Sequence, residues 1–355
     1  MTTSPVPAPV PASTATPAVS APAPAAAAST PVPADRGPAG RSPSAAPSAA
    51  PSAALSAALS APKRRRSPRS PRTPLSPRPS VPLTLVTGLV LVYTLLPLAW
   101  LFINATKDQK GLMDSFGLWF ADDFNLWDNI TRTFSYDDGA FVRWLLNTLL
   151  YVAAGAGGAT VLAVLGGYAL AKFAFPGRRA VFAVVIGAVA VPGTALAVPT
   201  FLMFSKMGLT NTPWAVIIPS LISPFGLYLM WVFAAEAVPT ELLEAARIDG
   251  SGELRTFFRI ALPLLMPGAV TVLLFSMVAT WNNYFLPLIM IKDPDWYPLT
   301  LGLNAWNAQA QTAGGEPVFD IVITGSLLTI VPIVAVFLLL QRYWQSGLAA
   351  GSVKE

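Results

Sequence analysis

Six long apolar stretches follow one another after residue 80, and they constrain the fold more than any other feature of the sequence. They lie at 82–104, 144–173, 180–205, 213–235, 264–291 and 321–340. Each has roughly the 20 residues that a helix needs to cross the hydrocarbon core of a membrane. Because lipid offers the backbone no hydrogen-bond partner, such stretches cross as helices. The sequence therefore predicts an all-α membrane protein with six transmembrane helices.

Prolines lie inside several of these stretches, including the third and the fourth. Pro192 and Pro199 lie in the third, and Pro219 and Pro224 lie in the fourth. Proline lacks a backbone N–H group and clashes with the preceding turn of a helix, so we expect kinks at these places. Kinked helices suit a moving gate, and they suit a static bundle equally well.

Composition supports a membrane protein and narrows its chemistry. Only 12% of the 355 residues are charged, whereas a soluble domain carries about 25%. The chain has no cysteine and no histidine, which excludes disulfides, thiolate nucleophiles and most transition-metal chemistry. We therefore expect no cofactor, no metal and no catalytic site.

The N-terminal region has a different composition. Residues 1–62 are almost entirely Ala, Pro, Ser, Thr and Val, which predicts a disordered tail. A basic cluster then precedes the first apolar stretch, formed by Lys63, Arg64, Arg65, Arg66, Arg69, Arg72 and Arg78. This placement favours contact with membrane lipid and argues against nucleic acid as a partner.

The distribution of basic residues predicts the orientation. With the N-terminus inside, 17 of the 23 lysines and arginines fall on the cytoplasmic side, as the positive-inside rule requires. Both termini are then cytoplasmic in a multi-pass protein of the cell membrane. The predicted organisation is a tail at 1–80, a first helix with an external loop at 81–143, a transmembrane domain at 144–342 and a cytoplasmic tail at 343–355.

A charged insert at 239–267 separates two of the apolar stretches, and this orientation puts it in the cytoplasm. Pro239 suits the start of a helix, and Glu241 places negative charge against the positive end of the helix dipole. Gly250 can adopt the left-handed conformation that ends a helix. We expect a short helix, a sharp turn and a second helix that enters the bilayer.

The insert carries a spaced pattern: Glu244, Ala245 and Ala246, then Gly250 after three residues, then Ile260, Leu262 and Pro263 after nine more. This pattern resembles the signature of the membrane subunits of binding-protein-dependent ABC importers. IDG at 248–250, WNNYFLPL at 281–288 and QRYWQSGLAAGSVK at 341–354 resemble the carbohydrate-import branch, specifically its maltose-permease-like second subunit. The resemblance covers the chain from about residue 81 and implies the type-1 ABC importer fold.

This resemblance implies a role for the insert and a set of partners. The short helix would be a coupling helix, seated in a groove of an ATP-hydrolysing subunit and formed around Glu244, Ala245, Ala246, Asp249 and Gly250. Glu244 would pair with a basic group, the alanines would allow close approach and Gly250 would set the turn. The implied partners are a homologous permease subunit, two ATP-binding subunits and an extracytoplasmic sugar-binding protein. The alternative is an ordinary cytoplasmic loop with a solvated charged face.

A polar cluster in the fifth stretch offers contacts to a substrate. It consists of Trp281, Asn282, Asn283 and Tyr284. Amides can bind sugar hydroxyls and an aromatic face can cover sugar C–H groups. Alternatively, these side chains satisfy one another or lie at the membrane interface. No Asp, Glu, Lys or Arg lies in the interior of any stretch, which argues against ion-driven transport; Lys172 is at the end of the second.

The sequence thus predicts a permease subunit that imports a carbohydrate and is not itself an enzyme. The pattern G-x-x-x-x-G-K-[ST] is absent from the sequence, so ATP would be bound by another polypeptide. Two alternatives stay open: the same machine with a polyol or glycerol phosphate as cargo, and an ATP-independent facilitator.

Overall fold

The structure is a computed structural model that describes residues 80–352, apart from the side chains of 342 and 344–352. The chain divides into two units, Met1–Leu75 and Ser76–Glu355, and the described residues belong to the second. The predicted disordered tail and its basic cluster lie outside the described residues, as do the last three residues of the chain.

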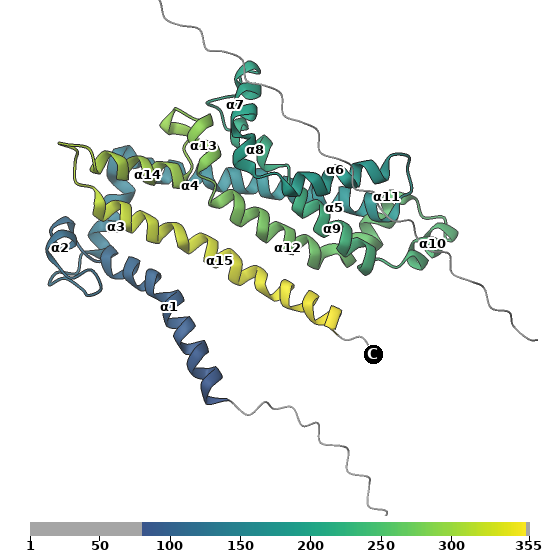
Figure 1. The fold of residues 1–355 in the computed structure, drawn as a ribbon, viewed down its shortest axis with the longest axis horizontal. Helices are drawn as coiled ribbons and strands as arrows, with labels where there is room; N and C mark the ends of the chain where they lie inside the picture. Colours follow the sequence, from purple (N-terminus) through teal and green to yellow (C-terminus); the bar gives the residue numbers. More distant parts are fainter. Residues whose placement is uncertain (1–79, 353–355) are drawn as a thin grey trace, which may run out of the picture. The chain divides into compact units, whose positions relative to one another are not determined.

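The described residues form helices and no strand, which confirms the all-α prediction (Figure 1). The helices are α1 Val81–Ala105, α2 Gln109–Asp114, α3 Leu126–Ser135, α4 Ala140–Tyr151, α5 Gly157–Lys172, α6 Arg178–Ala190, α7 Ala197–Lys206, α8 Trp214–Ser220, α9 Pro224–Ala237, α10 Thr240–Ile248, α11 Glu253–Thr256, α12 Leu262–Trp281, α13 Phe285–Met290, α14 Leu299–Ala310 and α15 Phe319–Ser352. Single π-helical turns at Val152–Ala156 and Phe257–Ala261 join α4 to α5 and α11 to α12.

Five helical stretches are long and apolar enough to span a membrane, and a sixth is a bent pair. The five are Val81–Ala105, Leu126–Lys172, Trp214–Ala237, Glu253–Trp281 and Phe319–Gln341. The pair is α6 with Gly193–Lys206, which meet at 100°. Six predicted spans are therefore present by length and composition, provided that the bent pair is one span.

The bend in the third span has a local cause. Pro192 removes a backbone donor and forces the residue before it out of the helical region. Val191 is accordingly extended, with φ −83° and ψ 120°, and it ends α6. Pro192 is thus a break in the helix, which is a larger disruption than the kink that the sequence predicted.

The fifth span also differs from its predicted bounds of 264–291. Its helix ends at Trp281, and α13 begins only at Phe285. Pro287 explains the break, because its ring would clash with the carbonyl of Asn283 if the helix continued. Residues 282–284 therefore form a non-helical link.

The core is centred on α5, α9 and α12, with the closest association between α5 and α9. Gly167 makes this association possible, since a Cβ atom there would lie 2.7 Å from the backbone of Met230 and Trp231. Small residues at helix interfaces are the usual way for membrane helices to approach closely. Met230, Ala234 and Leu265 are fully buried at this junction.

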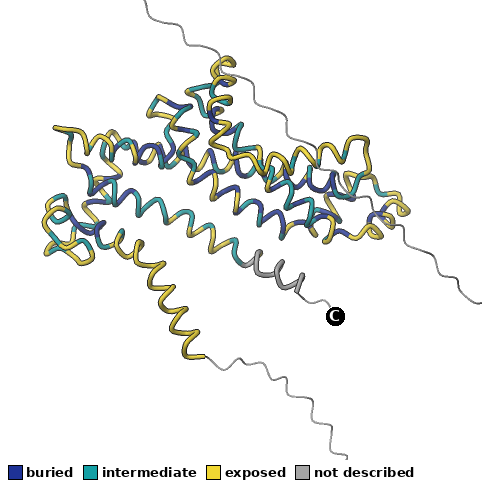
Figure 2. Tube along the Cα trace, in the orientation of Figure 1, coloured by how far each residue is buried: buried dark blue, intermediate teal, exposed yellow. Residues whose placement is uncertain are grey.

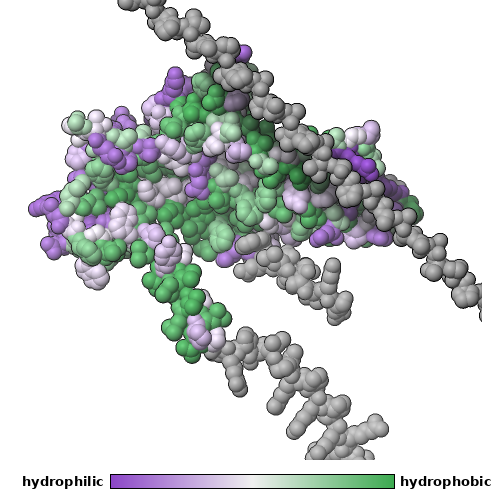
Figure 3. Space-filling model, in the orientation of Figure 1, coloured by the Kyte–Doolittle hydropathy of each residue, from purple (hydrophilic) through white to green (hydrophobic). Residues whose placement is uncertain are grey.

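The first helix is exposed along most of its length (Figure 2). It contacts α15 near the C-terminal end of α1. Its surface is strongly apolar, as Figure 3 shows in green. Apolar side chains exposed on this scale need lipid or protein around them. This surface agrees with a membrane environment for α1.

Candidate functional site

The charged insert folds as expected, as α10, a turn and α11. We call 239–256 the coupling segment, after the role that the resemblance implies. The turn is a Schellman motif: the N–H of Gly250 donates to the carbonyl of Arg247 at 3.0 Å, and the N–H of Ser251 donates to that of Ala246 at 2.9 Å. Gly250 has φ 75°, in the left-handed region that favours glycine. The sequence predicted this turn at the right residue.

The two faces of α10 have different surroundings. Leu243 and Ala246 are buried, and Leu243 belongs to the same core cluster as Tyr168, Met230 and Leu265. Ala246 is therefore covered by residues of this chain, whereas the resemblance had implied that both alanines approach a partner. Ala245 is exposed, as are Glu244, Asp249 and Gly250.

The coupling segment also exposes apolar side chains, and the sequence reasoning missed their exposure. Leu242 is 45% exposed, Ile248 is 87% exposed and Leu254 is 77% exposed. Exposed apolar side chains near the carboxylate of Glu244 agree with a surface that another protein covers. The signal was present in the sequence, since these leucines and the isoleucine do not fit the buried face defined by Leu243 and Ala246.

One ion pair spans the turn of the coupling segment. The guanidinium Nε of Arg247 donates to Oε1 of Glu253 at 2.7 Å, and both side chains are about half exposed. The hydrogen bond and the negative charge of Glu253 raise the pKa of Arg247, so its charge persists. Among the described residues, Glu244 makes no hydrogen bond or ion pair, which leaves its carboxylate available to a partner.

The predicted polar cluster at 281–284 is divided by the break after α12. Trp281 is 4% exposed and packs in an apolar core cluster with Trp144 and Leu299. The Asn282 side chain donates back to the carbonyl of Val278 at 2.9 Å. Asn283 is half-buried, and its carbonyl accepts from Thr300 at 2.8 Å. None of these three residues is among those that line the pocket around Tyr284.

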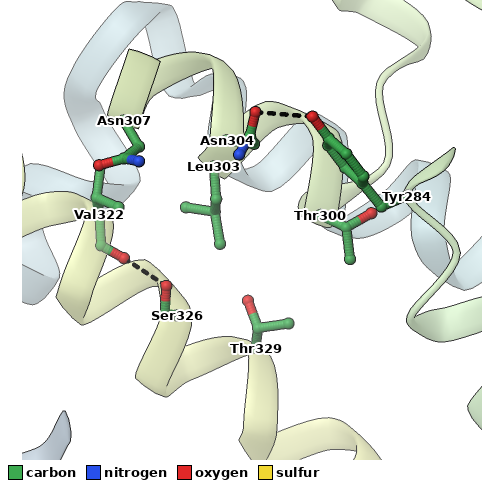
Figure 4. A pocket seen from close by; sticks show the side chains of 8 residues that line it. All are labelled: Tyr284, Thr300, Leu303, Asn304, Asn307, Val322, Ser326 and Thr329. Carbon is green, nitrogen blue, oxygen red and sulfur yellow. Dashed lines mark hydrogen bonds between the residues drawn. The ribbon is translucent and has the colours of Figure 1, made fainter. Parts of the chain in front are cut away.

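Tyr284, the fourth member, lies in a pocket of about 530 Å³ between α14 and α15. Its hydroxyl donates to Oδ1 of Asn304 at 3.0 Å. Figure 4 shows side chains of α14 facing those of α15 across this space. We call it the polar pocket, lined by Tyr284, Thr300, Leu303, Asn304, Asn307, Val322, Ser326 and Thr329.

The sequence reasoning missed every member of the polar pocket except Tyr284. A signal was available: Thr300, Asn304 and Asn307 recur at intervals of four and three residues, which places them on one helix face. Val322, Ser326 and Thr329 repeat the same spacing on α15. Nothing in the sequence shows that these two faces meet.

Comparisons with known proteins identify the class of protein that this fold and coupling segment define, a multi-span membrane component of a transport system. Residues 159–349 match the model of the binding-protein-dependent transport system inner membrane component family. This match includes the whole pattern from Glu244 to Pro263. The chain belongs to this family.

Individual relatives support the same conclusion. The chain is 38% identical over 188 residues to the arabinooligosaccharides transport system permease protein AraQ of Halalkalibacterium halodurans, covering 53% of this chain and 65% of that relative. It is 29% identical over 279 residues to AraQ of Bacillus subtilis, covering 77% and 95%. It is 30% identical over 272 residues to the diacetylchitobiose uptake system permease protein DasC of Streptomyces coelicolor, covering 76% and 95%.

A solved structure shares the fold. A chain of a bacterial ABC transporter involved in the import of the acidic polysaccharide alginate superposes with a TM-score of 0.66. The identity is 20%, and the match covers 74% of this chain and 95% of the other. The likeness supports the type-1 importer fold that the sequence pattern implied.

Proposed function

We propose that this chain is the membrane-spanning permease subunit of an ATP-driven, binding-protein-dependent importer of a carbohydrate. The observation that carries the proposal is the coupling segment, which has the complete family pattern and exposes an acidic and apolar face. Family membership supports the transport role. The names of the relatives, which refer to arabinooligosaccharides and diacetylchitobiose, favour a carbohydrate as cargo.

The proposed machine needs other polypeptides. They are a homologous permease subunit, two ATP-binding subunits and an extracytoplasmic sugar-binding protein, with membrane lipid around the helices. The chain is not itself an enzyme in this proposal, because its sequence has no phosphate-binding loop and its partners hydrolyse ATP. Both termini and the coupling segment face the cytoplasm, as the distribution of basic residues favours.

The packing of α10 suggests how force is transmitted. Leu243 anchors the helix in the core that contains Tyr168 of α5, Met230 of α9 and Leu265 of α12. A push on the exposed face of α10 is therefore delivered to three packed helices. Closure of the ATP-binding subunits would shift this core and change access across the membrane, as for other bistable helical packings.

ATP-dependent uptake of labelled neutral sugars tests the proposal in vesicles that contain the chain with its partner subunits and binding protein. Glu244→Lys reverses the charge at the one acidic position of the pattern, and this position lies outside the buried core. We expect it to abolish ATP-dependent uptake and to weaken retention of the ATP-binding subunits. Asp114→Lys, on the exposed helix α2, is the matched control and should retain those subunits normally.

Two results would contradict the proposal. The first is uptake that continues when the ATP-binding subunits are left out, which would favour an ATP-independent facilitator. The second is full activity of the Glu244→Lys variant, which would remove the assignment of α10 as the coupling helix.

A further inference from the structure

The polar pocket is built from neutral hydrogen-bonding groups. Its polar lining consists of Tyr284, Thr300, Asn304, Asn307, Ser326 and Thr329, and no charged residue lines it. A volume of about 530 Å³ lies within the range of about 300–1,000 Å³ typical of small-molecule sites. The lining therefore suits a polar ligand without net charge.

The hydroxyl groups in the pocket are arranged as acceptors. Thr300 donates to the carbonyl of Asn283 at 2.8 Å, Ser326 to that of Val322 at 2.7 Å and Thr329 to that of Gly325 at 2.8 Å. Each hydroxyl has one proton, and each proton is already used. The oxygen atoms keep lone pairs that can accept hydrogen bonds from a ligand.

The two asparagines supply the donors. The Oδ1 atom of Asn304 accepts from Tyr284, which fixes the orientation of the amide and leaves its NH₂ group to donate. Asn307 lies one turn further along α14 and brings a second amide. Leu303 and Val322 add apolar surface between the polar groups (Figure 4).

We infer that the polar pocket is a carbohydrate-binding subsite on this subunit, and the inference rests on the proposed function. A sugar hydroxyl both donates and accepts, so it matches a lining that offers both kinds of group. Sugar C–H groups match Leu303, Val322 and the ring of Tyr284. A phosphate or carboxylate would find no cation there and an ammonium would find no carboxylate, so a glycerol phosphate is disfavoured as the occupant.

The absence of cysteine from the chain allows a direct test. Ser326→Cys places a single thiol in the pocket with little change in volume. In the assembled transporter in membranes, we expect this thiol to react with a maleimide and the transported sugar to slow the reaction. The control is Thr131→Cys on the exposed face of α3, whose alkylation the sugar should not change.

Removal of one amide then tests the chemistry. In the Ser326→Cys background, Asn307→Leu keeps the side-chain size and loses the hydrogen-bonding groups. The sugar concentration for half-protection should rise about two- to twelvefold, as expected for the loss of one net hydrogen bond. Gln309→Leu, an equivalent change at an exposed position of α14 outside the pocket, should leave this concentration unchanged.

The outcomes separate the subsite from the proposed function. If the unaltered transporter shows no ATP-driven sugar uptake, the proposed function is wrong. If uptake is normal but the sugar protects neither thiol, or protects both equally, the subsite is wrong. A Ser326→Cys thiol that does not react at all in the assembled transporter would also overturn the subsite, because another subunit would then cover the pocket.

Discussion

The coupling segment and the polar pocket are built in opposite ways. The coupling segment depends on a short run of sequence, with one backbone conformation at Gly250 and one buried face formed by Leu243 and Ala246. The polar pocket depends on two helix faces that are distant in sequence and on several weak, neutral hydrogen bonds. A single substitution should therefore disable the first, whereas the second should lose affinity in small steps.

The buried face of α10 should give the largest effect. Leu243 is 3% exposed, so Leu243→Ala leaves a cavity and should lower the free energy of unfolding by about 2–5 kcal/mol. Leu242, its neighbour on the exposed face, is the matched control, and Leu242→Ala should leave stability nearly unchanged. Thermal unfolding of the two purified variants in detergent measures the difference.

The two variants should rank in the opposite order when properly folded protein is tested for retention of the ATP-binding subunits. Leu242→Ala should then have the larger effect. It should weaken retention, since Leu242 is an exposed apolar side chain of α10. Equal loss of stability in the two variants would mean that α10 is not anchored in the core by one face.

Substitution at the turn residue Gly250 should give the second-largest effect. A Cβ atom there meets nothing within 4 Å, so any effect of Gly250→Val comes from the backbone, which must keep φ 75°. Holding a non-glycine residue in this region costs about 1–3 kcal/mol, which predicts a fall of about five- to 140-fold in ATP-driven uptake. Gly252 is a matched control with equal space around it and an extended backbone at φ −69°.

Uptake by Gly252→Val should stay close to that of the unaltered chain. Gly250→Asn should restore part of the lost uptake, since asparagine tolerates the left-handed region better than valine does. A Gly250→Val variant with normal uptake would show that the turn geometry does not matter for coupling.

The pocket should respond more weakly to any one change. Tyr284→Phe removes the hydroxyl that orients Asn304, and the sugar concentration for half-protection should rise by at most about tenfold. Tyr297→Phe removes a hydroxyl that bonds the carbonyl of Lys292 outside the pocket, and it should have no such effect. Loss of all protection in the Tyr284 variant would mean that the pocket, like the turn, depends on one residue.

This contrast explains how much the sequence could predict. The helical class, the positions of most spans and the turn at Gly250 follow from local patterns, namely apolar length and the positions of glycine and proline. The burial of Ala246 does not follow from a local pattern. The motif requires small residues at 245 and 246, but it does not say which of them packs inside the protein and which contacts a partner. The same holds for the break at Pro192, since a proline in a span is compatible with a mild kink.

The different surroundings of the four residues at 281–284 have a related cause. Placing Trp281, Asn282, Asn283 and Tyr284 together assumes one continuous helix or loop. The break before Pro287 turns each residue toward a different neighbour. The partners of Tyr284 come from 300–329, and only the packing of α14 beside α15 brings them close.

The ion pair across the turn should have the smallest effect and the clearest dependence on salt. Arg247 and Glu253 are 46% and 47% exposed, and exposed pairs of this kind contribute little because water and salt screen them. Arg247→Met and Glu253→Gln, singly and together, should each lower ATP-driven uptake by at most about fivefold, with the double variant no worse than the singles. High salt should reduce uptake by the unaltered chain toward the level of the double variant and leave half-protection of the Ser326→Cys thiol unchanged, because the pocket has no charge to screen. A salt response at the pocket, or none at the ion pair, would contradict the distinction between a charged coupling segment and a neutral pocket.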